Sequence, residues 1–321
     1  MYEKWKGVHT RCAFNMIQEL IPLTRPRTLA ATLGPTILGA AFSYYAFGAA
    51  QGTGLAIFHT MLIFLAVVTA QIVANLWNEY KDFKSGLDAG QKVGNAGSIT
   101  RGVITPELII TMIKVLMFVP IIIGLYLSAT ITWYYIPVGF LCILISFLYS
   151  GGPKPISRTP FGEISSGIAM GFAIVLITGY AWIRELSLAL LIPAIPSTLL
   201  VGSIMLTNNI RDIRNDESHG RHTLPIVLGR ERALSLMSIS YIFNFIWIIA
   251  WIIVGHMTWF ALLAFLAAPL AFKTIHTLST NTDEFQLDKA MGTTAGAAMI
   301  YQLMWACLLY TSPSPRDRTR S

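Results

Sequence analysis

The chain has 321 residues, of which 54% are hydrophobic and only 12% are charged. Because soluble domains carry about 25% charged residues, this composition excludes an ordinary soluble domain and predicts a protein that lies mostly in lipid. The formal net charge of +7 does not indicate a nucleic-acid partner, since the basic residues lie in short loops between apolar runs, as membrane orientation requires.

Nine apolar runs follow a basic and aromatic segment that covers residues 1–27 and lacks the apolar region of a signal peptide. Each run is close to the ~20 residues that a helix needs to cross a bilayer. The runs cover residues 28–49, 57–79, 106–128, 132–149, 161–183, 187–210, 233–254, 257–272 and 291–310. The sequence therefore predicts an all-α membrane protein with nine transmembrane helices over residues 28–310, preceded by an interfacial segment.

The basic residues of the loops are distributed unevenly. The N-terminal segment and the loops after the second, fourth, sixth and eighth runs contain almost all of them, whereas the other loops contain only Arg184. Loops on the cytoplasmic side of a membrane carry an excess of Lys and Arg. We therefore expect the N-terminus and the ends of the even-numbered runs to face the cytoplasm, in the inner membrane of the cell.

Polar clusters close the second and sixth runs, at residues 75–88 and 208–216. Both contain Asn-x-x-x-Asp, and the second adds one more acid four residues on: Asn78 and Asp82, then Asn208, Asp212 and Asp216. Residues four apart share one face of a helix, and acids at membrane helices favour a functional role. Carboxylate and amide oxygens bind Mg²⁺, whose usual further ligand is a phosphate-bearing substrate. The matched spacing predicts one site built from two halves.

Glycines recur in the fifth run, at Gly167, Gly171 and Gly179. Small residues on one helix let a neighbouring membrane helix approach closely. We expect the fifth helix to pack tightly through this face.

The motifs taken together resemble the UbiA-type intramembrane prenyltransferases. Within that superfamily they are closest to the polyprenyltransferases that act on 1,4-dihydroxy-2-naphthoate in menaquinone biosynthesis. The resemblance covers residues 23 to 308 and rests on the segments Arg25-Pro26-Arg27-Thr28, 75–88, Tyr149–Pro155, Gly162-Glu163, 208–216 and Gly220–Arg230.

The resemblance implies a helix bundle around a central cavity, where a polyprenyl group passes from polyprenyl diphosphate to an aromatic acceptor. It implies Mg²⁺ held by Asn78, Asp82, Asn208, Asp212 and Asp216. The basic residues that could clamp the diphosphate are Lys92, Arg101, Lys154, Arg158 and Arg221. Further expected site residues are Asp82 or Asp88 as the base, Tyr149 beside the acceptor or the cation path, and Asn75, Glu79 and Asn209 in the lining.

Two positions depart from the family pattern. Glu79 stands where the family usually has Asp directly after the first-motif Asn. Gly97 stands where a basic residue usually precedes the glycine that corresponds to Gly102, and the nearest base is Arg101.

Two other functions compete with this interpretation. A relative could act on another acceptor, such as 4-hydroxybenzoate, homogentisate or a glyceryl phosphate. A cation- or proton-coupled transporter would also need acids, but near the middle of the membrane on broken helices. The two clusters instead lie at the ends of their runs, which favours diphosphate chemistry.

The last residues, 311–321, differ in kind from the run that they follow. They are polar, contain two prolines and three arginines, and resemble a translated sequencing adapter. Nine spans would place these arginines outside, against the charge distribution of the other loops. We expect this tail to be foreign to the fold and disordered.

Deletion of residues 311–321 should therefore leave thermal stability in detergent and the expected transfer activity unchanged within error. A segment with so little apolar surface cannot pack against a bundle. Unfolding midpoints and turnover of the full and truncated chains provide the measurement. A collapse of expression or activity in the truncated chain would show that the tail belongs to the fold.

Overall fold

The computed structural model describes residues 20–87, 97–255 and 257–311, and every regular element among them is a helix. Most of the interfacial segment and the tail from residue 312 lie outside these residues. The elements are η1 (Pro26–Leu29), α2 (Ala30–Phe47), α3 (Thr53–Ser85), α4 (Pro106–Thr130), α5 (Tyr135–Ser150), η3 (Ile156–Arg158), α6 (Gly162–Ser166), η4 (Gly167–Phe172), α7 (Ala173–Ile183), η5 (Leu188–Leu190), α8 (Leu191–Arg211), α9 (Ile213–Ser218), α10 (Leu224–Leu228), α11 (Arg230–Ile253), η6 (Trp259–Ala267), α12 (Ala268–Thr280) and α13 (Glu284–Thr311).

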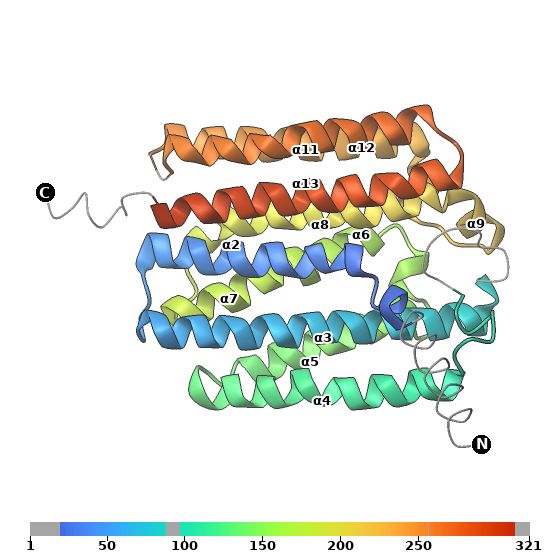
Figure 1. Cartoon of the computed structure of the whole chain (residues 1–321), viewed down its shortest axis with the longest axis horizontal. Helices are drawn as coiled ribbons and strands as arrows, with labels where there is room; N and C mark the ends of the chain where they lie inside the picture. The colour runs from blue at the N-terminus through green and yellow to red at the C-terminus, as the bar shows by residue number, and fades with distance from the viewer. Residues whose placement is uncertain (1–19, 88–96, 256, 312–321) are drawn as a thin grey trace, which may run out of the picture.

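The long helices lie side by side in one bundle, with their axes roughly parallel or antiparallel (Figure 1). Within the described ranges, six helical segments are long and apolar enough to cross a membrane. They are Thr53–Ser85, Pro106–Thr130, Gly162–Ile183, Leu188–Arg211, Arg230–Ile253 and Trp259–Thr280. Helices α2, α5 and α13 run beside them (Figure 1). The predicted all-helical membrane architecture is confirmed, and the number of nine spans stays a prediction.

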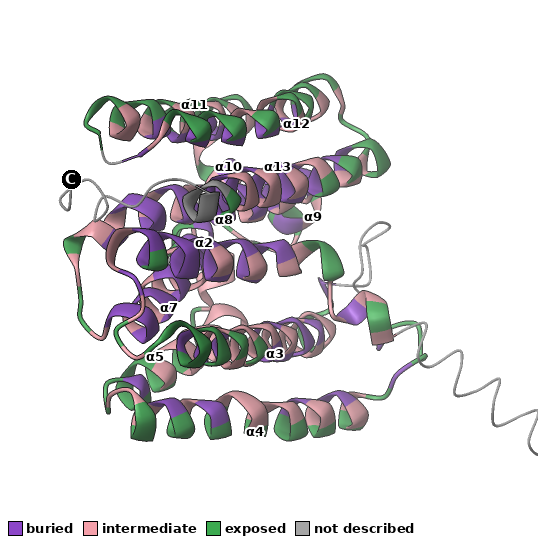
Figure 2. Cartoon of the chain, turned by 60° about the vertical axis from the view of Figure 1, so that its left-hand side comes forward, coloured by how far each residue is buried: buried purple, intermediate pink, exposed green. Residues whose placement is uncertain are grey.

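The outer helices α4, α11 and α12 carry many exposed residues (Figure 2), and large apolar residues are among them. Phe118 and Ile122 of α4 are each 62% exposed, and Ile239 of α11 is also 62% exposed. A water-facing patch of this kind would be costly, whereas hydrocarbon accepts it without penalty. The outer surface of the bundle therefore suits lipid.

Two helices extend beyond the apolar runs that predict them. Helix α3 continues past the expected end at residue 79 to Ser85, where Gly86 closes it with a φ of 74°. Helix α13 starts at Glu284, before the expected start at residue 291. Hydropathy detects only the part of a helix inside the bilayer, and polar residues can continue the same helix beyond it. Both extensions place acidic residues on helices at the same end of the bundle (Figure 1).

Two glycines of the predicted face pack against helix α8, and Gly179 packs against Leu190 of η5. A Cβ added at Gly167 would lie 2.6 Å from the carbonyl oxygen of Thr198. A Cβ at Gly171 would lie 2.6 Å from the carbonyl oxygen of Ser197 and from Cα of Thr198. These glycines occupy η4, a π-helical turn between α6 and α7. Because the two backbones touch, α6 and α8 carry their polar residues within hydrogen-bonding distance of each other.

Replacing Gly171 by Ala should destabilise the fold by about 1–3 kcal/mol, because the new methyl group meets backbone atoms that cannot move independently. The thermal unfolding midpoint in detergent measures this loss. Gly124→Ala in α4 is the matched control, since a Cβ there meets nothing within 4 Å and helix propensity favours Ala. Equal midpoints for Gly171→Ala and the wild type would contradict the close packing.

Candidate active site

A cavity of about 280 Å³ runs through the bundle between α2, α3, α5, α7 and α8. It follows α3 from Val67 to Asp82, which is about 22 Å at the rise of an α-helix. Its middle is apolar, with walls that include Val67, Ile145, Ile174, Ile177, Val201 and Ile204. Its polar end lies where α3 and α8 finish and α9 begins. The cavity can thus accept a ligand with a long apolar chain and a charged head.

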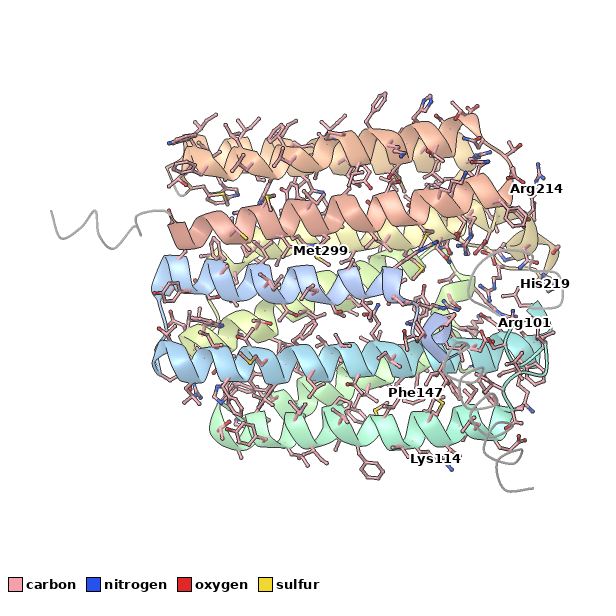
Figure 3. All side chains as sticks on the ribbon, in the orientation of Figure 1. Arg101, Lys114, Phe147, Arg214, His219 and Met299 are labelled. Carbon is pink, nitrogen blue, oxygen red and sulfur yellow. The ribbon has the colours of Figure 1, made fainter. Side chains whose placement is uncertain are left out.

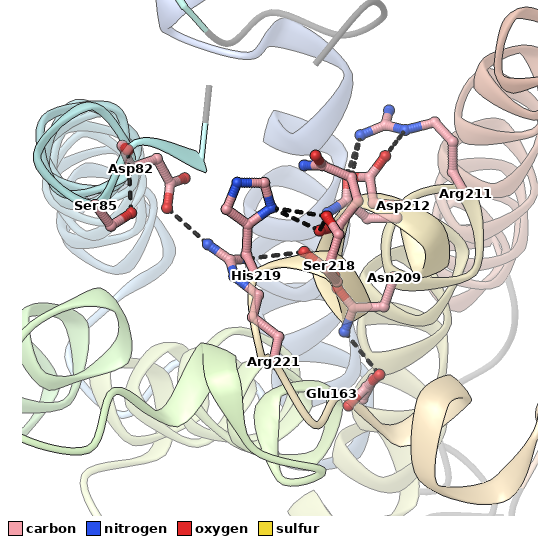
Figure 4. A network of polar contacts seen from close by, with 12 residues as sticks. Asp82, Ser85, Glu163, Asn209, Arg211, Asp212, Ser218, His219 and Arg221 are labelled. Atoms are coloured by element: carbon pink, nitrogen blue, oxygen red, sulfur yellow. Dashed lines mark hydrogen bonds and ion pairs between the residues drawn. The ribbon is translucent and has the colours of Figure 1, made fainter. Parts of the chain in front are cut away.

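The two acidic motifs meet at this polar end, although they lie far apart in the sequence. Arg221 connects them (Figure 4). Its Nη2 lies 2.7 Å from Oδ1 of Asp82, and its Nη1 lies 3.3 Å from Oδ1 of Asp216. One guanidinium group therefore contacts a carboxylate from each of the two motifs.

Arg211, at the end of α8, joins the second motif to helix α13. Its Nε and Nη2 each lie 2.7 Å from one carboxylate oxygen of Asp212, a bidentate arrangement. Its Nη1 donates to Oδ1 of Asp288 at 2.9 Å, and its Nη2 also donates to Oδ1 of Asn208 at 2.9 Å. Arg27 extends this network of ion pairs, since its Nη1 lies 2.6 Å from Oδ2 of Asp288.

Asp216 shows the electrostatic character of the site. Burial raises the pKa of this carboxyl to about 7, since its side chain is only 4% exposed. The neighbouring Arg221 opposes this rise in pKa, while Asp212 and Asp82 add to it. A further cation at the polar end would stabilise the ionised form of Asp216.

Asn78 and Tyr149 approach the cavity from α3 and α5. The side-chain oxygen of Asn78 accepts a hydrogen bond from the hydroxyl of Ser150, and both residues line the cavity. Tyr149 also lines the cavity, together with Ser166 of α6. Tyr149 therefore stands where the polar end joins the apolar channel.

Asn209 and Asn75 both lie in the lining of the cavity. The amide nitrogen of Asn209 donates to Oε1 of Glu163 at 2.8 Å (Figure 4). This bond fixes the orientation of the amide, so its oxygen is the atom that remains for a ligand. The amide nitrogen of Asn75 donates to the carbonyl oxygen of Thr24 at 3.0 Å, which ties α3 to the segment before η1.

Glu79 lies behind the cavity, not in its lining. Its Oε1 accepts from the backbone nitrogen of Gly97 at 2.9 Å and of Ser98 at 2.7 Å, and the residue is 1% exposed. Gly97 has a φ of 91°, a left-handed conformation that favours glycine. The two positions that depart from the family pattern thus contact each other and fix the loop that leads to Arg101.

The basic residues predicted to bind the diphosphate differ in their distance from the cavity. Arg221 lines the cavity, and Arg158 lies near enough to Asp82 to act on it electrostatically. Arg101 and Lys154 are exposed outside the cavity lining, and Arg101 donates to the hydroxyl of Ser98 at 3.2 Å. Arg101 lies at the same end of the bundle as Arg214 and His219 (Figure 3). Asp88 and Lys92 lie outside the described residues.

Sequence reasoning missed four charged residues of the cavity lining, Arg25, Arg27, Arg211 and Asp288. Arg25 and Arg27 open the first helix and looked like ordinary cytoplasmic charges. Asp288 sits in a polar stretch before the last apolar run. Extending that run backward as a helix would have placed Asp288 on the face of Met291, which also lines the cavity.

The residues at the polar end fit Mg²⁺ as a ligand set. Among the residues that the structure describes, no three carboxylate, imidazole or thiolate groups converge on one point. Two arginines separate the carboxylates instead. Mg²⁺ is usually held by one or two carboxylates together with substrate phosphates, not by an all-protein cage. Oxygen donors from two motifs around one cavity satisfy that requirement.

Two sequence comparisons identify related proteins. The model of the UbiA prenyltransferase family matches residues 33–312. The 1,4-dihydroxy-2-naphthoate octaprenyltransferase of Bacillus subtilis (strain 168) is 36% identical over 288 residues, which cover 88% of each chain. The enzyme of the same name from Mycobacterium tuberculosis is 28% identical over 286 residues, covering 87% of this chain and 92% of the relative.

Solved structures share the fold. A UbiA homolog from Aeropyrum pernix K1 superposes with a TM-score of 0.67 at 18% identity, covering 89% of this chain and 98% of that chain. A UbiA homolog from Archaeoglobus fulgidus, bound to DMAPP and Mg²⁺, gives 0.60 at 15% identity, covering 90% and 99%. With the family model matching most of the sequence and the bundle matching these structures, the chain belongs to the UbiA prenyltransferase family.

Proposed function

We propose that this protein transfers a polyprenyl group from polyprenyl diphosphate to 1,4-dihydroxy-2-naphthoate, in menaquinone biosynthesis. The names of its curated relatives support this acceptor, and the B. subtilis enzyme does so over 88% of both chains. The observation that carries the proposal is the meeting of two acidic motifs at the polar end of an otherwise apolar cavity. That shape matches a substrate with a charged head and a long apolar chain.

The arginines act on the leaving group. When the allylic C–O bond of the donor breaks, both electrons leave with the diphosphate, which gains negative charge. Arg25, Arg211 and Arg221 line the cavity at its polar end, and fixed guanidinium groups stabilise such charge. Mg²⁺ would neutralise the remaining charge on the diphosphate, held by oxygens of Asn78, Asp82, Asn208, Asp212 and Asp216.

The apolar channel protects the prenyl cation. Walls such as Ile145 and Ile174 exclude water, so an allylic cation next to them reaches the acceptor ring before it is hydrolysed. The ring carbon forms the new C–C bond, and a carboxylate takes the proton that the acceptor loses. Asp82 lines the cavity at its polar end, and Asp88 is the alternative base. Tyr149 stands at the junction, where it can hold the acceptor or flank the cation.

The polar end of the bundle also indicates how the protein is oriented in the membrane. Both motifs and most basic loops gather there, so we infer a cytoplasmic position for this end and nine spans through the inner membrane. The six long apolar segments and the three further helices beside them support that number. Carboxylates at helix ends also argue against a transporter with acids at mid-membrane.

The acceptor can be identified from the products. Purified protein should be incubated with one prenyl diphosphate, MgCl₂ and, separately, 1,4-dihydroxy-2-naphthoate, 4-hydroxybenzoate, homogentisate or glyceryl phosphate. We expect mass spectrometry to detect a prenylated product with the naphthoate and little or none with the others. A product formed from another acceptor alone would assign the protein to a different branch of the family.

Activity should require a divalent cation and both motifs. Asp82→Ala and Asp212→Ala should each lower turnover by about 10²–10³-fold, because each removes an anchor for charge stabilisation at the leaving group. Glu107→Ala, an exposed acid in the first turn of α4, is the matched control and should retain activity. Near-normal turnover of either motif variant, or of the wild type in excess EDTA, would refute the two-motif site.

A further inference from the structure

Asp288 belongs to no motif, yet it contributes a carboxylate to the polar end from helix α13. It contacts two arginines, with 2.9 Å from Oδ1 to Nη1 of Arg211 and 2.6 Å from Oδ2 to Nη1 of Arg27. The Arg27 side chain is 56% exposed, so solvent screens its contact with Asp288. The Arg211 side chain is only 7% exposed. Its contact with Asp288 therefore has the larger effect.

Arg211 competes with any cation for Asp212. Both carboxylate oxygens of Asp212 accept hydrogen bonds from Arg211, each at 2.7 Å. Each oxygen keeps a second lone pair, but a metal ion that binds Asp212 through the lone pairs that now face Arg211 must displace at least one of these bonds. A buried guanidinium that loses its carboxylate partner carries a large desolvation penalty. This penalty is smaller when another anion stays beside Arg211, and Asp288 is such an anion within the protein.

We propose that Asp288 is a positioning residue that retains Arg211 while Asp212 turns to the metal-bound diphosphate. This inference rests on the proposed function, because it assumes that Asp212 binds the cation. Asp288 fits the role because it approaches Arg211 through Nη1, the nitrogen that Asp212 does not use. Arg211 can thus keep one carboxylate and lose the other.

Removing the charge of Asp288 should weaken the binding of the metal ion but not the binding of the diphosphate. Without Asp288, Arg211 holds Asp212 more firmly, and the site also loses one negative charge, so metal binding weakens for both reasons. The same loss of negative charge leaves binding of the anionic diphosphate unchanged or strengthens it. General damage to the fold would weaken both.

The test measures metal binding directly. Mn²⁺, used as a probe for Mg²⁺, is titrated into the full chain with geranylgeranyl diphosphate and no acceptor, and free Mn²⁺ is followed by EPR. Asp288→Asn should weaken Mn²⁺ binding about 10-fold, the usual effect of losing a residue that orients a metal ligand. Binding of the diphosphate at saturating Mn²⁺ should not weaken.

Matched variants separate the explanations. Asp283→Asn removes the same charge at the exposed start of α13 while keeping a residue that can cap the helix, and should bind Mn²⁺ like the wild type. Asp288→Glu, which restores the anion, should recover most of the lost binding. In an Arg211→Gln background, Asp288→Asn should weaken Mn²⁺ binding far less than 10-fold, because the competitor for Asp212 is gone.

Three results would overturn the role of Asp288. They are unchanged Mn²⁺ binding in Asp288→Asn, an equal loss in Asp283→Asn, or a full 10-fold loss that persists with Arg211→Gln. Thermal unfolding midpoints show whether each variant is folded. If Asp288→Asn does not fold, the Mn²⁺ affinity of Asp288→Glu is compared with that of the wild type instead. A wild type that binds no Mn²⁺ with the diphosphate would instead refute the proposed function.

Discussion

The polar end of this bundle depends on arginines that neutralise carboxylates from distant segments. An isolated charge buried at a membrane boundary would cost several kcal/mol, and a paired charge costs far less. Arg221 pairs with Asp82 of α3 and Asp216 of α9, and Arg211 pairs with Asp212 and with Asp288 of α13. These contacts hold the ends of the helices together and, at the same time, place the acids around one cavity.

The pairing also explains how an acidic site can persist before any cation arrives. Several carboxylates in a shared cavity repel one another, and burial pushes a group such as Asp216 toward its protonated form. The arginines reduce that repulsion, since each lies between two acids. Because guanidinium groups also bind phosphate oxygens through paired donors, the same side chains suit a diphosphate that enters between the motifs. Fold stability and ligand binding therefore use the same residues.

Helix packing determines how close the polar groups come. Gly167 and Gly171 leave no side chain between η4 and α8, so the two backbones touch. One consequence is the 2.8 Å bond from Asn209 to Glu163, which orients an amide of the second motif. The two departures from the family pattern also depend on a close contact, because the longer Glu79 side chain reaches the backbone of Gly97. A glycine there permits the left-handed turn that the contact needs.

The sequence by itself determined the class of protein and most of its helices, and it predicted the two acidic motifs of the candidate site. Apolar runs of bilayer length predicted the membrane helices, and the repeated Asn-x-x-x-Asp predicted two halves of one site. These features are local, since hydropathy and helical spacing depend only on neighbours along the chain. Family resemblance added the chemistry, because its motifs are contiguous as well.

Only the tertiary structure decided which charges face the cavity and which partners they take. Arg221 meets Asp82 across 139 positions of sequence, and Arg27 meets Asp288 across 261. Among the bases expected to clamp the diphosphate, spacing did not distinguish Arg221 in the cavity from Lys154 outside it. Asp288 carried no motif at all. Such pairings depend on where each helix ends and how it is rotated in the bundle, and these are properties of packing among all the helices.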